Sequence, residues 1–124
     1  MELIQDAPHE AKYQEHLIAE SRRGHPLLTQ ELKDRFRELG PQDHPRAIVV
    51  AKYFHPFSDW TWYATAYDPK DELFFGLVHG MYTELGYFGL HDLKGLINGL
   101  PFERDLHWNE CILSDLQAML PPRG

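Results

Sequence analysis

The middle of the chain carries the hydrophobic patterns of β-strands. Residues 47–54 form a nearly unbroken apolar run, and residues 61–67 alternate strictly between two faces. Two more strand patterns follow at residues 73–79 and 82–88. The connections between these runs are short, and such connections join antiparallel neighbours because a parallel crossover needs about a dozen or more residues. The pattern therefore predicts a four-stranded antiparallel β-meander over about residues 46–88.

Apolar residues at helical spacing flank the predicted sheet on both sides. A thin apolar stripe predicts a first helix over residues 8–22. A second helix is expected to begin after the N-cap Thr29 and to end at Gly40, which precedes a proline. After the sheet, the pattern predicts a helix at residues 90–98, an extended piece at residues 103–108 and a last helix at residues 110–120.

These elements predict a single domain of the α+β class, because a chain of 124 residues suits one core. We expect residues 27–124 to form this domain and residues 1–26 to form an N-terminal helical extension. The acidic N-terminus lacks the apolar run of a signal peptide, and no stretch approaches the roughly 18 apolar residues of a membrane span. Cys111 is the only cysteine. These features favour a cytoplasmic protein.

Aromatic residues make up 13% of the chain and supply the strongest candidates for a binding surface. Trp60 and Trp62 are expected to point into the core. Tyr63 and Tyr67 fall on the opposite face of their strand, together with either Phe74 or Phe75 from the next one. Exposed aromatic residues on such a sheet can bind a protein partner or stack single-stranded bases. The sequence predicts a binding site at Tyr63, Tyr67, Trp60, Tyr87 and His55.

The charge of the chain bears on which partner is expected. The formal net charge is −7, which disfavours a protein whose main task is to neutralise phosphates. A basic cluster remains, and a solvated helix face explains it better than a nucleic-acid site. The cluster comprises Arg22, Arg23, Lys33, Arg35 and Arg37. A protein partner is therefore favoured, and a single-stranded nucleic acid is an alternative that this cluster and the aromatic face would bind.

Metal-assisted catalysis is a second alternative. The chain has eight histidines, but none forms an HxxxH pair and no Cys-x-x-Cys frame is present, so there is no zinc signature. Glu103, Asp105 and His107 would share one side of an extended segment, where they could hold a cation for a hydrolase or nuclease, with His79 or Glu84 as further candidates. Structural ion pairing explains these residues better.

Nucleophilic and nucleotide chemistry have less support. Cys111 is expected in the first turn of the last helix, where backbone N–H groups can lower the pKa of a thiol. No cysteine-protease signature accompanies it, so a buried cysteine acting as a small hydrophobic residue is favoured. The glycines between residues 76 and 89 lie within and between strands, so they predict no phosphate-binding loop. We predict no catalytic residue and no cofactor.

Four aromatic-rich motifs occur in order in the second half of the chain: Trp60–Tyr63, Leu73–Val78, Glu84–Phe88 and Glu103–Leu106. Together they resemble the bacterial domain of unknown function 2958 family (DUF2958), from about Leu27 to Leu116. The resemblance implies a small protein of plasmids, integrative elements or phages, with no assigned activity. The prediction is therefore a non-catalytic protein-binding module of a mobile element. Its partner would be a host or element-encoded protein, and the genomic setting suggests inhibition of host defence.

Overall fold

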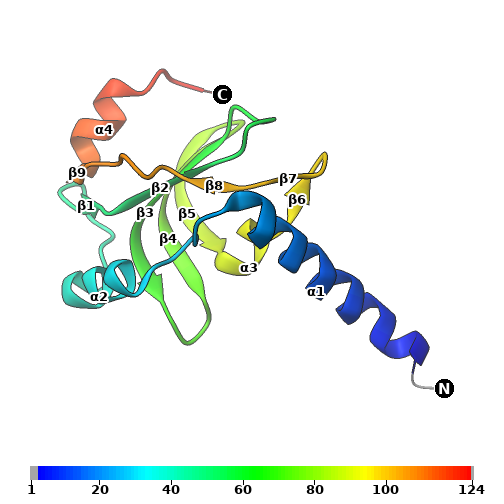
Figure 1. The fold of residues 1–124 in the computed structure, drawn as a ribbon. Helices are drawn as coiled ribbons and strands as arrows, with labels where there is room; N and C mark the ends of the chain where they lie inside the picture. The colour runs from blue at the N-terminus through cyan, green and yellow to red at the C-terminus, as the bar shows by residue number, and fades with distance from the viewer. Residues whose placement is uncertain (1–2, 124) are drawn as a thin grey trace.

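The computed structural model describes the backbone of residues 3–123 and the side chains of residues 10–123. Helices and short strands surround one central sheet (Figure 1). In chain order the elements are α1 (Leu3–Arg23), α2 (Gln30–Leu39), β1 (Ile48–Val49), β2 (Ala51–Phe54), β3 (Thr61–Asp68), β4 (Leu73–His79), β5 (Thr83–Gly89), α3 (Leu90–Leu93), β6 (Leu96–Ile97), β7 (Leu100–Pro101), β8 (Glu103–Arg104), β9 (Cys111–Ile112) and α4 (Leu113–Met119). The predicted α+β class is confirmed.

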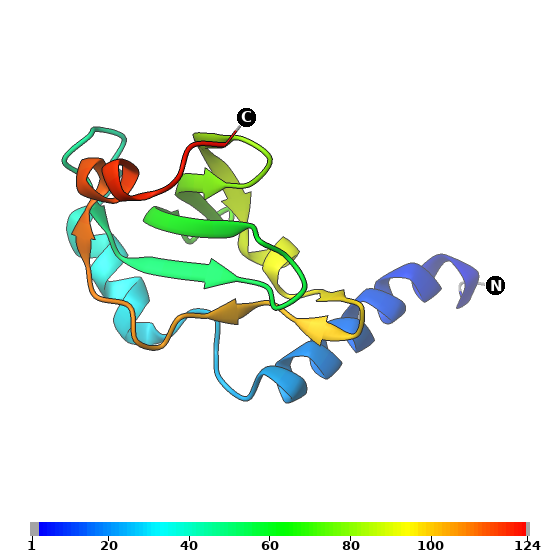
Figure 2. The same ribbon diagram turned by 90° about the horizontal axis from the view of Figure 1, so that it is seen from above.

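The central sheet has five antiparallel strands in the order β5-β4-β3-β2-β8. The predicted meander is confirmed in β2 to β5, but the predicted number of four strands is wrong. The fifth strand, β8, returns from the C-terminal part of the chain and pairs Arg104 with Tyr53 and Glu103 with Phe54. Figure 2 shows it beside β2. A strand of two residues carries no periodicity of its own, so only its long-range pairing identifies it.

Residues 90–98 do not form the predicted helix. α3 ends at Leu93, and the chain then forms the separate hairpin of β6 and β7. Asn98 and Gly99 connect these two strands with φ values of 52° and 78°. A two-residue type I′ turn requires this left-handed conformation, and Asn-Gly is its strongest local signal. The sequence therefore contained the information that overrides the weak helical pattern.

The last helix begins at Leu113 rather than at residue 110, because the residues before it form β9 and pair with β1. The first helical amides find their acceptors in the chain that precedes β1. Leu113 N donates to Ala47 O at 2.8 Å, and Ser114 N donates to Pro45 O at 2.9 Å. Backbone carbonyl groups thus satisfy amides that a capping side chain would otherwise bind.

The second helix forms as predicted and covers one face of the sheet. Thr29 Oγ1 accepts a hydrogen bond from Leu32 N at 3.1 Å, and Gly40 ends the helix with a φ of 67°. Phe36 is buried on the inner side of α2, and its ring lies 5.9 Å from that of Phe74 in β4. We call this side of the sheet the α2 face.

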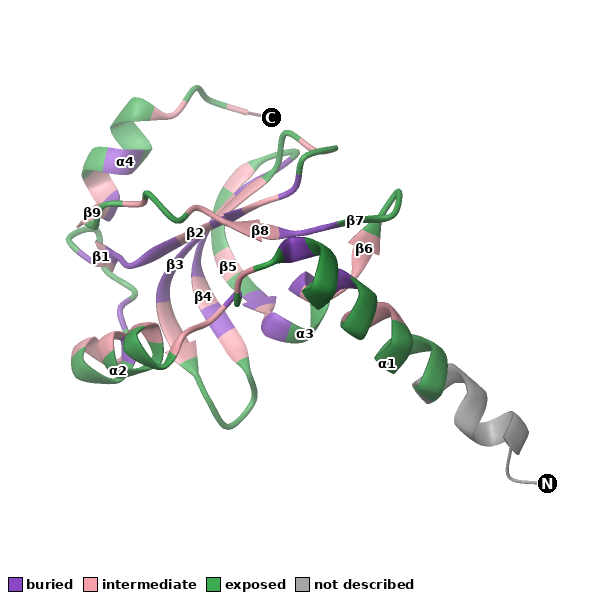
Figure 3. Ribbon diagram, viewed as in Figure 1, coloured by how far each residue is buried: buried purple, intermediate pink, exposed green. Residues whose placement is uncertain are grey.

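The opposite side, the α4 face, has a smaller core. Tyr63 of β3 is paired with Leu77 of β4, and Leu113 and Leu116 of α4 pack against both. Trp108 lies beside Tyr63 with ring centroids 5.6 Å apart. The buried cluster does not extend to β5, whose residues on this face are exposed or half-buried, as most of the strand is in Figure 3. The α4 face is therefore only partly covered.

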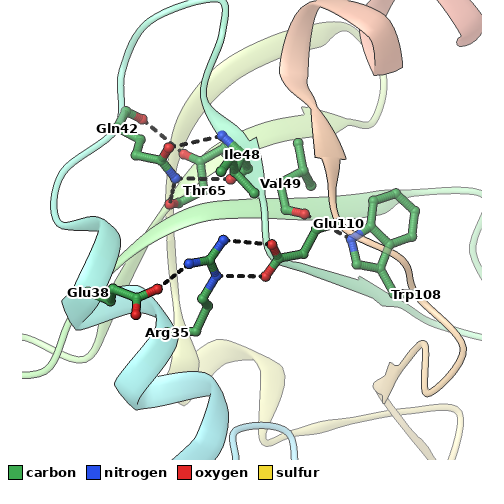
Figure 4. A network of polar contacts seen from close by, with 8 residues as sticks. All are labelled: Arg35, Glu38, Gln42, Ile48, Val49, Thr65, Trp108 and Glu110. Carbon is green, nitrogen blue, oxygen red and sulfur yellow. Dashed lines mark hydrogen bonds and ion pairs between the residues drawn. The ribbon is translucent and has the colours of Figure 1, made fainter.

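The central strand β3, which contributes to both cores, contains a β-bulge. The register of β3 against β4 shifts between Ala64 and Ala66, which leaves Thr65 as the extra residue. Gln42, in the linker between α2 and β1, binds this irregularity (Figure 4). Its Nε2 donates to Thr65 O at 2.7 Å and to Ile48 O at 3.0 Å, and its Oε1 accepts from Ile48 N at 2.9 Å. One buried glutamine thus joins the bulge, the linker and the start of β1.

The bulge changes which face the later residues of β3 occupy. Tyr63 precedes it and points to the α4 face. Tyr67 follows it and packs on the α2 face, with its ring 6.1 Å from Phe36 and 4.8 Å from Phe74. The expectation that Tyr63 and Tyr67 share one exposed face is therefore wrong, because a two-residue period holds only in an unbroken strand.

The first helix contacts the rest of the domain through its C-terminal turns. Ala19 is fully buried, Arg23 Nε donates to Phe102 O at 2.7 Å, and Arg22 donates to Gly99 O. The helix lies beside β6 and β7 at this end and extends away from the sheet toward the N-terminus (Figure 1). Within residues 3–123, no helix combines the length and the apolar character that crossing a membrane requires.

Replacing Gln42 should test the bulge anchor. Gln42→Ala removes three hydrogen bonds and leaves buried groups of Thr65 and Ile48 without partners, so the free energy of unfolding should fall by about 2–3 kcal/mol. Gln30→Ala is the matched control. Its side chain is exposed and binds only Asp34 of the same helix, so the change should stay within about 0.5 kcal/mol. Urea denaturation measures both variants, and equal effects would contradict the anchoring role.

Candidate functional site

A row of three side chains crosses the part of the α4 face that α4 leaves uncovered. Ala66 of β3 is paired with Phe75 of β4, and Phe75 is paired with Tyr87 of β5. The rings of Phe75 and Tyr87 meet edge to face, with centroids 5.0 Å apart. Tyr87 is 71% exposed. This row therefore presents an aromatic surface that is held by the sheet and open to solvent.

The row borders a groove of about 560 Å³, which we call the Tyr87 groove. β2 begins its pairing with β3 at Ala64, so no strand of residues 3–123 pairs with the C-terminal half of β3 on that side. The linker after α2 takes this place, with Gln42 bound to Thr65. α2, this linker and the β3–β4 hairpin supply the remaining walls. The bulge anchor thus also shapes the groove.

Charged groups around the Tyr87 groove are balanced. Two cations from α2 and two carboxylates from the linker and the hairpin line it: Lys33, Arg37, Asp43 and Asp68. Arg37 is also bound to Asp34 of its own helix. Such a lining does not favour a strongly charged ligand such as a phosphate chain.

Tyr67 provides a polar group at the Tyr87 groove. Burial raises the pKa of its hydroxyl, and the neighbouring carboxylates of Glu72 and Asp68 raise this pKa further. The hydroxyl therefore stays protonated at neutral pH and can donate a hydrogen bond. An aromatic groove with neutral donors such as this hydroxyl has the chemistry of a site for a mainly apolar segment with a few polar groups.

The other predicted binding residues lie outside this groove. Tyr63 is only 4% exposed and belongs to the core under α4. His55 is buried and has a structural role. Its Nδ1 accepts a hydrogen bond from Phe57 N at 3.0 Å, so the proton is on Nε2, which donates to Leu100 O at 2.8 Å. Of the five predicted residues, the structure brings together Tyr67 and Tyr87.

The two tryptophans of β3 and its preceding loop differ in burial. Trp62 packs against the core of the α2 face as predicted. Trp60 is 38% exposed, so the expectation that it points into the core is wrong. Its ring lies against Gly80, where an added Cβ would come within 2.6 Å of it. Trp60 stands at the end of the sheet away from the Tyr87 groove, and its predicted role in binding stays a prediction.

The predicted metal candidates line a second cleft of about 540 Å³ but do not converge on one point. Glu103 Oε1 lies 3.1 Å from His25 Nε2, and Asp105 Oδ1 accepts a hydrogen bond from His107 N at 2.9 Å. The Asp105 contact, together with the hydrogen bond from Trp108 N to Asp105 O at 3.4 Å, forms a turn after β8, where an extended piece was predicted. Among side chains 10–123, no group of three or more His, Cys, Asp or Glu residues is arranged to hold a metal ion.

The predicted basic cluster is divided between two places and largely engaged. Arg22 and Arg23 bind backbone carbonyl groups of the β6–β7 region. Arg35 makes a two-point contact with Glu110, at 2.9 Å for both Nε–Oε2 and Nη2–Oε1, and also binds Glu38 (Figure 4). The contacts of Arg22, Arg23 and Arg35 with distant residues join elements of the fold, and Arg37 is paired with Asp34 within α2.

Sequence reasoning missed two residues that define the site. Gln42 lies in a linker, and nothing local indicates that its amide binds a strand distant in sequence. Leu85 of β5 is 45% exposed beside Tyr87 on the same face. Its alternation with Tyr87 is visible in the sequence, but its exposure depends on β5 being an edge strand, which is a property of the strand order.

Comparisons with known proteins identify a family without a known activity. Residues 26–117 match the model of a family described as protein of unknown function (DUF2958). The matched region contains every strand in the described part of the chain and begins after the end of α1. No curated protein and no solved structure matches the chain.

Cys111 offers a test of the chemistry around the last helix. It lies in β9 before α4, and burial raises the pKa of its thiol, as does the carboxylate of Asp115. Iodoacetamide at neutral pH should therefore alkylate Cys111 several-fold more slowly in the folded protein than in the urea-unfolded chain. Asp115→Asn should raise the rate of alkylation in the folded protein, since it removes the carboxylate that helps to raise the pKa of the Cys111 thiol. Alkylation that is faster in the folded protein would contradict this environment.

Proposed function

The chain belongs to the DUF2958 family, whose function is unknown, and we propose that it is a non-catalytic binding module that holds a segment of a protein partner in the Tyr87 groove. The observation that carries this proposal is the pairing of Phe75 with the exposed ring of Tyr87 beside a groove of about 560 Å³. The partner is a protein of the host or of the genetic element that encodes the chain.

The aromatic row is suited to anchoring a partner. Tyr87 lies on a strand that pairs with β4 along its length, and its ring packs edge to face with that of Phe75. A rigid aromatic side chain loses little conformational freedom on binding, which is why tyrosines are enriched among the residues that dominate interface energies. Neighbouring apolar surface at Leu85 would exclude water from the contact.

Charge favours a protein over a nucleic acid as the partner. The chain carries a net charge of −7, and four of the five residues of the predicted basic cluster are bound within the fold. Binding to single strands needs basic groups along the backbone path as well as stacking surfaces. The charges around the Tyr87 groove are balanced, so aromatic contacts with an uncharged segment explain the surface better.

The mobile-element setting and the inhibition of host defence belong to the same proposal. They come from the resemblance on the four sequence motifs, and the groove adds a place where a defence protein would be held. A binding module can inhibit a partner without chemistry of its own when it covers an active or assembly surface.

Truncating Tyr87, the exposed member of the aromatic row, should strongly weaken partner binding without affecting the fold. In affinity capture from an extract of the native host, Tyr87→Ala should lower retention of the specific partner by at least about tenfold, because truncation of a residue that anchors an interface costs about 2 kcal/mol or more. Tyr13→Ala is the matched control, since Tyr13 is a 61% exposed tyrosine on α1. Quantitative mass spectrometry measures retention, and unchanged melting temperatures confirm folding. Equal partner recovery by both variants would overturn the proposal.

A further inference from the structure

The strand that carries Tyr87 is the edge of the central sheet. No strand in residues 3–123 pairs with the outer side of β5. We propose that β5 binds its partner as an added antiparallel strand: an extended segment with apolar residues at alternate positions and a basic residue placed opposite Glu84. This inference rests on the proposed function and specifies the form and chemistry of the bound segment.

The hydrogen bonds at both ends of β5 fix which backbone groups are free. Leu90 N donates to Glu72 O at 3.0 Å, and Gly80 N donates to Tyr82 O at 2.9 Å. Both bonds belong to the register that pairs β4 with β5. In an antiparallel ladder, hydrogen-bonded pairs alternate with pairs that exchange no bonds.

The alternation assigns the backbone groups of β5 to two sides. The residues whose N–H and C=O groups bond to β4 are Glu84, Gly86 and Phe88. The residues whose N–H and C=O groups point away from the sheet are Thr83, Leu85 and Tyr87. An extended chain is the ligand whose own donors and acceptors match this spacing, which is the basis of recognition by strand addition.

The outward-facing residues also carry the exposed side chains. Leu85 continues the cross-strand row of Tyr63 and Leu77, and Tyr87 continues the row of Ala66 and Phe75. An added strand would extend both rows by one residue each, two positions apart on the α4 face. Two of its apolar side chains would therefore contact Leu85 and Tyr87. The side chain opposite Tyr87 would lie next to the Tyr87 groove.

Glu84 supplies the charge that selects the segment. It directly precedes Leu85 and lies on the other face of β5. It is exposed and makes no ion pair with any side chain of residues 10–123. An antiparallel segment would place one residue directly opposite Glu84, and opposite charges stabilise such a cross-strand pair. The segment expected here reads apolar, any residue, apolar, basic, from its N-terminus.

A second copy of the chain fits this edge less well than a partner. Glu84 is the only charged residue of β5. If two copies paired symmetrically about Leu85, Glu84 would face Gly86 of the other copy and gain no ion pair. If they paired symmetrically about Glu84, the two Glu84 carboxylates would face each other. Exposed charges of this kind discourage edge strands from pairing with themselves. A basic partner segment turns the same charge into an attraction.

Two peptides provide the direct test. The first is acetyl-Thr-Val-Thr-Val-Lys-Val-Thr-amide, which places lysine opposite Glu84, and the second has glutamate in place of lysine. Fluorescence anisotropy should show saturable binding of the lysine peptide and weaker binding of the glutamate peptide. Glu84→Lys should reverse the order, with a change of roughly fivefold for each peptide at low salt. No binding of the lysine peptide, or no reversal, would overturn the proposal.

Two substitutions at one position separate backbone from side-chain recognition. Leu85→Pro removes an outward N–H that does not bond to β4, and an edge strand tolerates such a proline. The substitution should weaken binding of the lysine peptide by at least about tenfold. Leu85→Ala keeps that N–H and should weaken binding by no more than about threefold. Circular dichroism and melting temperatures confirm that both variants fold. Equal weakening by the two variants would overturn strand addition.

The outcomes also separate this inference from the proposed function. If Tyr87→Ala abolishes partner capture while Leu85→Pro and Leu85→Ala capture the partner equally well, the groove binds a protein but strand addition is wrong. If Tyr87→Ala has no effect on capture, the proposed function fails as well. If the free protein sediments as a dimer that Leu85→Pro dissociates, the edge belongs to a second copy and the partner-strand proposal is overturned.

Discussion

The structure depends on one buried amide in the linker after α2. Gln42 binds backbone groups of Thr65 and Ile48, two residues that belong to different strands and to different sheets. A buried carbonyl or amide without a partner is costly, so an extra residue in β3 needs such a partner to persist. The bulge in turn moves Tyr67 to the α2 face and Ala66 to the α4 face. The two cores and the groove between α2 and the hairpin follow from this change of face.

The same arrangement explains why one part of the sheet is exposed. α4 is tied to the chain before β1 by the β1–β9 pairing and by the amides at its start, so it covers the middle of the α4 face. The side chains of β5 on that face remain in solvent. An exposed aromatic row, an adjacent groove and an unpaired strand edge then occur together. Each of these features is common by itself, and their coincidence on one strand makes this the surface that we connect with function.

The sequence predicted most of the local structure and part of the site. Strict alternation predicted β3, a run of strand-forming residues predicted β4, and the cap Thr29 and the terminal Gly40 predicted α2. The bulge was beyond such reasoning, because its cause is a tertiary bond from a linker residue. The strand β8 was missed because its two residues acquire strand character only by pairing with β2. At the site, Tyr67 and Tyr87 were named, but the burial of Tyr63 followed from the position of α4, which no local pattern encodes.

Residue-resolved amide hydrogen exchange along β5 tests the central claim, that this strand offers an open backbone edge to an extended partner. In the free protein, the amides of Thr83, Leu85 and Tyr87 should exchange rapidly, while those of Glu84, Gly86 and Phe88 should be protected by β4. Saturation with the lysine peptide should protect the first set and leave the second unchanged. Protection of the first set in the free protein, or rapid exchange that persists at saturation, would contradict the account.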